Sequence, residues 1–180
     1  MTEISNRAMR TLPLLELFDG LTRLAASGSG YESVLNTLRQ TLACSHALLL
    51  LEEDGGATVY AADETLPASL VRGVVSALGE TSEVIVEDLA RRDELDSLRA
   101  QLRAQQVQAL ALYPLVWNDA QFGMLLVAFR QPSSLSTEDE NTLKMVAAQL
   151  AMIVGRWRSA EQVIERVAAL EEQIGHFRQV

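Results

Sequence analysis

Residues 108–130 read QALALYPLVWNDAQFGMLLVAFR, two apolar runs separated by a short polar connector. The runs cover residues 108–117 and 122–130, and each is long enough to be a strand. The connector Asn118-Asp119-Ala120-Gln121 contains residues that favour turns. This stretch therefore predicts a β-hairpin.

A second hairpin is predicted earlier in the chain. An apolar run over residues 44–52 is followed by the turn Glu53-Asp54-Gly55-Gly56 and by a returning run over residues 57–62. The segment between the two hairpins, residues 63–106, has a weaker pattern. It predicts a helix over residues 68–78, a short strand over 83–88 and a charged surface helix over 91–105.

Two amphipathic helices precede the first strand. Leucines at three- and four-residue steps over residues 14–24 predict the first, with Pro13 in its opening turn, where a missing N–H is tolerated. Ser27-Gly28-Ser29-Gly30 ends this helix, and a second periodic run follows over residues 31–42. Residues 1–12 are predicted to be an N-terminal tail.

A long helix is predicted from Thr137 to about Phe177. Ser136 is a good N-cap, and the acids that follow favour the positive end of a helix. At 1.5 Å per residue the helix would be roughly 60 Å long, which exceeds the width of a small domain. Its last part carries apolar residues at the alternating three- and four-residue steps of a coiled coil: Ala160, Val163, Val167, Leu170, Ile174 and Phe177.

The charge balance narrows the classes of partner. The 180 residues include 24 acidic and 15 basic side chains, for a net charge of −9. Such a surface repels phosphate backbones and anionic lipid, so we expect neither nucleic acid nor a membrane as a partner. The longest apolar stretch is too short to cross a bilayer, and the first residues lack the apolar core of a signal peptide. A soluble, cytoplasmic protein is expected.

Histidine and cysteine are scarce. Cys44 is the single cysteine, and His46 and His176 are the two histidines. A disulfide, a thiolate cluster, a two-histidine metal site or a Ser/His/Asp triad has almost nothing to be built from. We therefore predict no metal, no cofactor and no enzymatic activity.

Several short motifs resemble the GAF family of sensory domains. Leu112-Tyr113-Pro114-Leu115 resembles the family's apolar-x-Pro-Leu strand, and Gly123-Met124-Leu125-Leu126 resembles its Gly-x-Leu strand. Leu135-Ser136-Thr137-Glu138-Asp139 is similar to its Phe-Ser-x-x-Asp helix start, with leucine in place of phenylalanine. Val84-Ile85-Val86-Glu87-Asp88 resembles, more loosely, the short strand that ends in an acid. The resemblance covers about residues 18–158. The related PAS domains are a less favoured interpretation, because they usually lack the paired helices before the first strand.

This resemblance implies an α+β fold. It consists of an antiparallel sheet of five or six strands, with the N- and C-terminal helices on one face and a helical insert, residues 63–106, on the other. Ligands of the family bind between the sheet and the insert. The cyclic-nucleotide signature Asn-Lys-x-Phe-Asp-Glu is absent, and the insert lacks the cysteine of bilin types and the histidine of haem types. One thiol cannot run the disulfide cycle of free methionine sulfoxide reductases.

Candidate site residues lie mainly on the first strand. Cys44 and His46 are two residues apart on the predicted strand and would therefore share one face. They could form a catalytic or metal-binding pair, but the favoured interpretation is that both pack against the flanking helices. Ala47 and Leu49 would then look toward the ligand pocket, together with Tyr113. Other aromatic and basic side chains that could hold a flat or anionic ligand are better explained as core and as a solvated helix face: Tyr60, Trp117, Arg91, Arg92, Arg99 and Arg103.

The expected function is that of a non-catalytic sensory or regulatory module. Residues 13–158 would form the GAF-like domain, and residues 159–180 a coiled-coil helix that forms a homodimer and transmits a signal to an output domain or partner. A ligand, if one exists, would be small and largely apolar or neutral, because the insert offers no dedicated clamp for a nucleotide. A methionine sulfoxide reductase-type enzyme and a ligand-free dimerisation scaffold are the alternatives.

Overall fold

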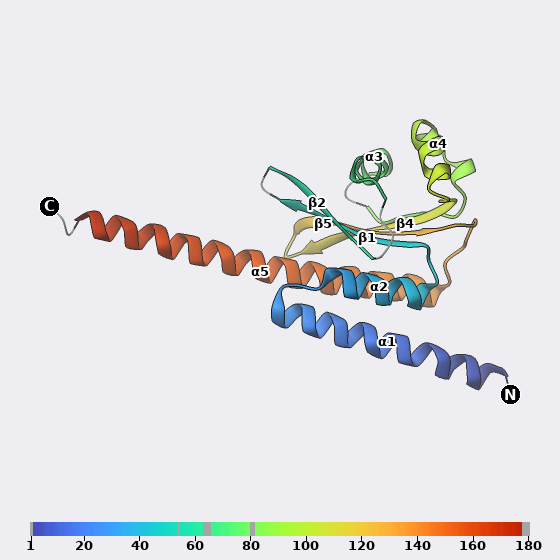
Figure 1. Cartoon of the computed structure of the whole chain (residues 1–180), viewed down its shortest axis with the longest axis horizontal. Coiled ribbons are helices and arrows are strands. Elements are labelled where there is room, and N and C mark those ends of the chain that lie inside the picture. Colours follow the sequence, from blue (N-terminus) through green and yellow to red (C-terminus); the bar gives the residue numbers. More distant parts are fainter. Residues whose placement is uncertain (1, 54, 63–65, 80–81, 178–180) are drawn as a thin grey trace.

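The computed structural model of this protein describes residues 2–53, 55–62, 66–79 and 82–177, with side chains only between residues 13 and 171. A five-stranded antiparallel sheet forms the middle layer, in the order β2-β1-β5-β4-β3 (Figure 1). Its strands are β1 (His46–Glu53), β2 (Gly56–Ala61), β3 (Val84–Val86), β4 (Ala109–Trp117) and β5 (Ala120–Phe129). Both predicted hairpins, β1–β2 and β4–β5, are confirmed.

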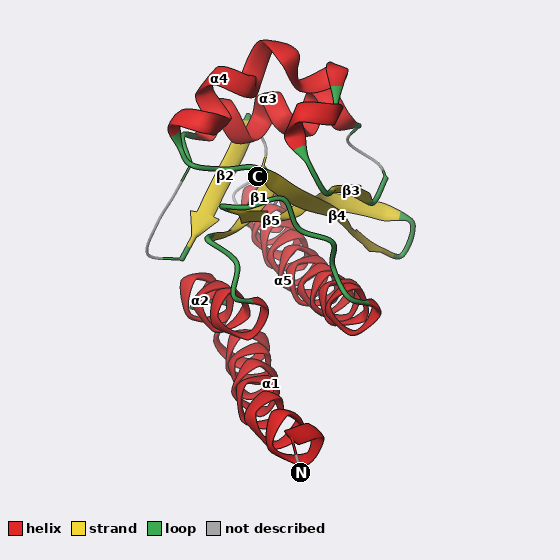
Figure 2. Cartoon of the chain, turned by 90° about the vertical axis from the view of Figure 1, so that its right-hand side faces the viewer, coloured by secondary structure: helices red, strands yellow, loops and turns green. Residues whose placement is uncertain are grey.

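Helices cover both faces of the sheet. The terminal helices α1 (Thr2–Ser27), α2 (Tyr31–Leu42) and α5 (Thr137–Phe177) lie on one face (Figure 1). The insert helices α3 (Ala68–Leu78) and α4 (Asp96–Ala104) lie on the other, as Figure 2 shows. Two short 3₁₀ turns, Leu89–Arg91 and Asp93–Leu95, replace the first part of the predicted helix over residues 91–105. The predicted three-layer arrangement is confirmed.

The central strands are buried on both faces, so the protein has two apolar cores. Ala47, Leu49 and Leu51 of β1 pack with the terminal helices in a helix-side core. The alternate residues Leu48 and Leu50 pack with the insert in an insert-side core. A strand covered on both sides has no polar residues to mark an outer face, and this explains the unbroken apolar runs in the sequence.

The β4–β5 turn is tighter than its sequence suggests. β5 begins at Ala120, so the connection is Asn118-Asp119 alone. Both residues have positive φ angles, 51° and 59°. A two-residue turn of this kind matches the twist of the paired strands, and asparagine and aspartate tolerate the left-handed conformation.

The prediction for the start of the first helix was wrong. α1 begins at Thr2, and Pro13 lies inside it, so residues 2–12 are helical where a tail was expected. Proline favours a first helical turn but does not dictate one, and an internal proline costs about 3 kcal/mol through its missing hydrogen bond. The preceding Arg7-Ala8-Met9-Arg10 are strong helix formers.

α5 begins where the sequence predicts. Ser136 Oγ accepts a hydrogen bond from the Asp139 N–H at 3.2 Å, which is the predicted N-cap. The helix continues past the edge of the sheet and projects from the domain (Figure 1). No helix in the described part of the chain combines the length and apolarity needed to cross a membrane.

Candidate functional site

The predicted ligand-binding residues lie on the wrong face of the sheet for the pocket they were assigned to. Ala47, Leu49 and Tyr113 all belong to the helix-side core, beneath α1, α2 and α5. The insert packs on the opposite face, against Leu48 and Leu50. The prediction counted Cys44 as a residue of the strand and assigned Ala47 and Leu49 to the face opposite to it. Cys44 precedes β1, so its side chain does not follow the alternation of the strand.

Cys44 and His46 do not form a pair. Cys44 follows the left-handed residue Ala43 that ends α2, and it packs in the helix-side core. His46 is buried at the start of β1 opposite Ala128, a member of the insert-side core, and its Nδ1 lies 2.9 Å from Ser45 Oγ. Burial raises the pKa of the Cys44 thiol to about 12. A thiol protonated at neutral pH is a poor nucleophile and metal ligand.

The space between sheet and insert is filled by side chains. Leu70, Val71 and Val74 of α3 are buried there, and so are Leu95 and Leu102 from the segment leading into and forming α4. They contact the insert-facing residues of β1, β4 and β5. The region where the family resemblance places a ligand is therefore a packed core in this structure.

Three of the remaining candidates have structural partners. Tyr60 packs against Tyr31 of α2, with ring centroids 4.7 Å apart. Trp117 lies against Gly155 of α5. Arg99 forms an ion pair with Asp96 and donates to the Arg92 carbonyl at 3.1 Å. These contacts agree with the core and helix-face interpretations.

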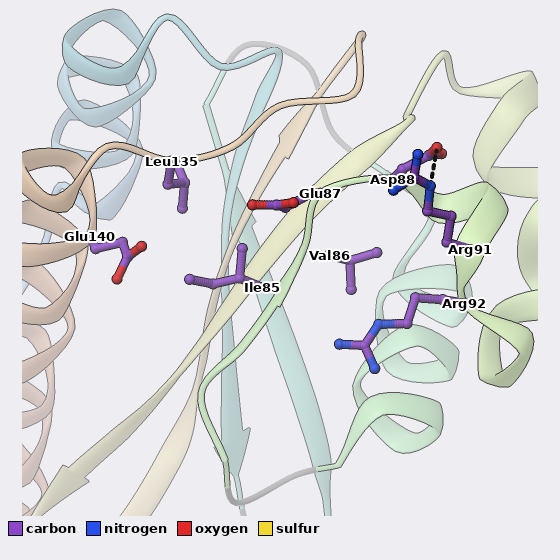
Figure 3. A pocket seen from close by; sticks show the side chains of 8 residues that line it. All are labelled: Ile85, Val86, Glu87, Asp88, Arg91, Arg92, Leu135 and Glu140. Atoms are coloured by element: carbon purple, nitrogen blue, oxygen red, sulfur yellow. Dashed lines mark ion pairs between the residues drawn. The ribbon is translucent and has the colours of Figure 1, made fainter.

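A groove of about 330 Å³ lies along the outer edge of β3. β3 is the last strand of the sheet, so one of its edges has no strand partner. Figure 3 shows side chains on both sides of this strand edge, contributed by β3, by the turn that follows it and by the start of α5. The lining residues are Ile85, Val86, Glu87, Asp88, Arg91, Arg92, Leu135 and Glu140.

The groove has an acidic wall and a basic wall, and the basic wall also carries one acid. Glu87, Glu140 and Leu135 lie on the α5 side of β3 with Ile85, whereas Arg91 and Arg92 lie on the insert side with Val86 and with Asp88, the ion-pair partner of Arg91 (Figure 3). Ile85 packs at the margin of the helix-side core and Val86 is buried in the insert-side core, as strand alternation requires. Sequence reasoning named Arg91 and Arg92 as possible anion-binding residues and preferred a solvated helix face. It missed Glu87 and Glu140, because the site joins Arg92 and Glu140 across a strand edge that no local pattern reveals.

Three contacts hold α5 where it leaves the domain, and we name these contacts the α5 collar. Gly155 lies against the rings of Trp117 and Phe122 in the β4–β5 hairpin. Trp157 lies beside Gly28 in the α1–α2 turn. Arg158 donates to the Glu52 carbonyl at the end of β1 and lies 5.3 Å from the Phe122 ring centroid. The collar therefore joins α5 to both hairpins and to the N-terminal helices.

Beyond the collar α5 is exposed. Val163, Ile164, Val167 and Leu170 are 61%, 68%, 49% and 58% exposed. Leu15 and Phe18 of α1 are also exposed, at 60% and 47%. The side chains of the two last predicted seam residues, Ile174 and Phe177, lie outside the described residues.

The family model for the GAF domain matches residues 30–154. The chain belongs to the GAF domain family. The match begins just before α2 and ends within α5, before the collar residues Gly155, Trp157 and Arg158. The exposed part of α5 is therefore an extension beyond the family's common GAF core.

Solved GAF domains share this fold. A GAF domain assigned to a sensor histidine kinase of Pseudomonas syringae pv. tomato is 20% identical, with a TM-score of 0.62 over 89% of this chain and 97% of that one. The GAF domain of a phosphoenolpyruvate-protein phosphotransferase from Coxiella burnetii is 15% identical, with a TM-score of 0.62 over 84% and 98%. The blue-light absorbing PixJ GAF domain of Thermosynechococcus elongatus is 19% identical, with a TM-score of 0.56 over 86% and 95%. The comparison with curated proteins found no match.

Proposed function

We propose that this GAF domain is a non-catalytic sensory or regulatory module that forms a homodimer through α5. A change in the domain would pass along the paired helices to an output domain or a signalling partner. The observation that carries the proposal is the apolar surface that α5 exposes beyond the collar. The sensor kinase context of one structural relative supports the same class of function.

A second copy of the chain is the partner that this surface fits. Val163, Val167 and Leu170 recur at steps of four and three residues, the spacing of a coiled-coil seam. A seam of this kind is self-complementary, because two identical helices related by a two-fold axis bury the same residues against each other. Fully burying one such side chain contributes about 1.5–3 kcal/mol. The exposed Leu15 and Phe18 of α1 offer a second strip for the same bundle.

The α5 collar supplies the coupling in this proposal. Arg158 and Gly155 contact the ends of both hairpins, so a shift of either hairpin changes the support of α5 at its exit point. A helix carries such a displacement along its length, because hydrogen bonds join each of its turns to the next. We expect the signal to take the form of a rotation or a register change of the two paired α5 helices at the seam.

Several observations argue against the enzymatic alternative. The reductase chemistry requires thiols that form and exchange disulfides, whereas Cys44 is the single cysteine of the chain and is buried with a pKa of about 12. In the described part of the chain no three His, Cys, Asp or Glu side chains are grouped as metal ligands. The single cysteine suits a reducing cytoplasm, and the charge of −9 disfavours nucleic acid and anionic membranes as partners.

A ligand-free dimerisation scaffold is the second candidate. The filled interface between sheet and insert favours it, because the family's usual ligand space is occupied by leucine and valine side chains. Native mass spectrometry of the purified chain separates the two candidates, since it reports subunit number and any retained small molecule together.

Light scattering tests the dimer directly. We expect the full chain to be dimeric at tens of micromolar and the double variant Val167→Glu, Ile174→Glu to be monomeric, because both changes place charge in the seam. Ala169→Glu is the matched control, since Ala169 is exposed on the opposite side of α5 and should keep the dimer. A monomeric full chain, or a double variant that stays dimeric, would contradict the proposal.

A further inference from the structure

We propose that the groove along the outer edge of β3 binds a small zwitterionic molecule, with its ammonium group between Glu87 and Glu140 and its carboxylate at Arg92. The inference names a ligand class for the sensory module, and in that respect it rests on the proposed function. The site is distinct from the interface between sheet and insert, which is filled.

The acidic wall has unmet charge. Within the described part of the chain, neither Glu87 nor Glu140 has an ion-pair partner. The third acid of the groove, Asp88, is already engaged, because its carboxylate accepts a hydrogen bond from the Ala90 N–H at 2.9 Å. Two carboxylates on either side of an apolar surface suit an ammonium group, which donates up to three hydrogen bonds.

The basic wall can receive an anion. Arg92 Nη1 lies 3.6 Å from a Glu94 carboxylate oxygen, and both side chains are partly exposed. This separation exceeds the 2.7–2.9 Å or so of a charge-assisted hydrogen bond, so the pair is loose. A ligand carboxylate could therefore bind the Arg92 guanidinium in a bidentate geometry without displacing a tight partner. Arg91 is 86% exposed and contributes mainly long-range attraction.

Size and shape restrict the ligand further. The volume of about 330 Å³ falls at the lower end of small-molecule sites. Ile85, Val86 and Leu135 provide an apolar floor for a short hydrocarbon body. The backbone at Glu87 is held by the Ser133 N–H, which donates to the Glu87 carbonyl at 3.0 Å. Phosphate esters are disfavoured, because Glu87 and Glu140 would repel their charge.

The ligand would connect two parts of the fold. Glu140 lies in the first turn of α5, whereas Arg92 belongs to the insert. A molecule that contacts both charges holds the start of α5 against the insert. This connection would link ligand binding to the helix that carries the exposed seam.

Calorimetric titration of the full chain with a series of ω-amino acids, from glycine to 6-aminohexanoate, tests the proposal. We expect one chain length to bind best, about tenfold tighter than the n-alkylamine and the carboxylate of equal length, because both charged ends are held at once. Glu140→Gln and Arg92→Gln should each weaken binding by about tenfold. The matched controls Glu138→Gln and Arg72→Gln, which lie outside the groove, should leave it unchanged.

Three results would overturn the proposal. These are no binding by any member of the series, equal affinity for the amine alone, and affinity that is insensitive to Glu140→Gln and Arg92→Gln. Repeating the titration on the seam variant Val167→Glu, Ile174→Glu separates the two proposals. If the wild-type chain is dimeric but binds no zwitterion, only the proposed ligand site is contradicted. If the wild-type chain is monomeric but binds a zwitterion, only the proposed dimeric function is contradicted.

Discussion

At the scale of single residues, Tyr113 is the most unusual side chain in the core. It is 2% exposed, and its hydroxyl has no hydrogen-bond partner in the described part of the chain. An unsatisfied buried hydroxyl costs about 1–3 kcal/mol. Burial raises the pKa of Tyr113 to about 12, and the negative charges of Glu83 and Glu140 add to the shift.

We predict that Tyr113→Phe stabilises the protein by about 1 kcal/mol at neutral pH, because it removes the unpaired hydroxyl and keeps the ring. The pKa in the folded state exceeds the unfolded value of 10.0, so the native state holds its proton longer. Titration of Tyr113 therefore leaves the free energy of unfolding unchanged below about pH 10. That free energy falls as the pH rises from about 10 through about 12, because the unfolded state loses the proton first.

Urea unfolding across this pH range measures the effect. Tyr113→Phe should lose less stability than the wild type at alkaline pH, whereas part of the loss remains because the pKa values of Tyr31, Tyr60 and Cys44 are also raised. The prediction would be wrong if Tyr113→Phe were less stable than the wild type at neutral pH and lost the same stability at alkaline pH. That result would show that the Tyr113 hydroxyl makes a hydrogen bond in the folded protein.

At the scale of elements, the docking of α5 depends on a glycine. A Cβ atom added at Gly155 would lie 2.8 Å from Trp117 Cζ3 and 3.0 Å from Phe122 Cε2, closer than packed carbon atoms approach. Both rings belong to the β4–β5 hairpin, so the absence of a side chain lets α5 lie directly on it. The same rings help to form the α5 collar.

Gly155→Ala should therefore destabilise the protein by about 1–3 kcal/mol through overpacking, although alanine is the better helix former by about 1 kcal/mol. Gly20→Ala is the matched control, because a Cβ at this α1 position meets only Val34 Cγ2, at an ordinary 3.5 Å. The control should be neutral or stabilising by up to about 1 kcal/mol. Chemical denaturation of both variants decides the point, and equal stability of the two would refute the packing argument.

At the scale of the whole molecule, α5 is long relative to the domain that supports it. The sheet and the N-terminal helices cover it only as far as the collar, and residues 160–171 are exposed throughout. In the proposed homodimer a second copy would cover the apolar side chains of this projecting helix, so folding and association would be linked.

This linkage predicts that the thermal midpoint of the full chain rises with protein concentration, by mass action on the dimer. Calorimetry over a hundredfold range of concentration measures the shift. The seam variant Val167→Glu, Ile174→Glu should show a midpoint that is independent of concentration. A constant midpoint for the wild type would mean that the exposed seam contributes nothing to stability.

The sequence by itself determined the elements and their order. Apolar runs bounded by turn residues located both hairpins, and Ser136 located the start of α5, because each signal is local and depends on neighbours within a few residues. The family motifs then gave the three-layer arrangement. The start of α1 was missed, because Pro13 suits a first turn as well as the interior position that it occupies.

Only the tertiary structure decided which face each strand residue occupies. Ala47 and Leu48 are both apolar, and burial on both sides of β1 removes the polar alternation that would distinguish them. The same is true of the groove, since Arg92 and Glu140 are brought together by the path of the chain around the β3 edge. Contacts between residues distant in sequence depend on how layers pack, and local spacing carries no information about that packing.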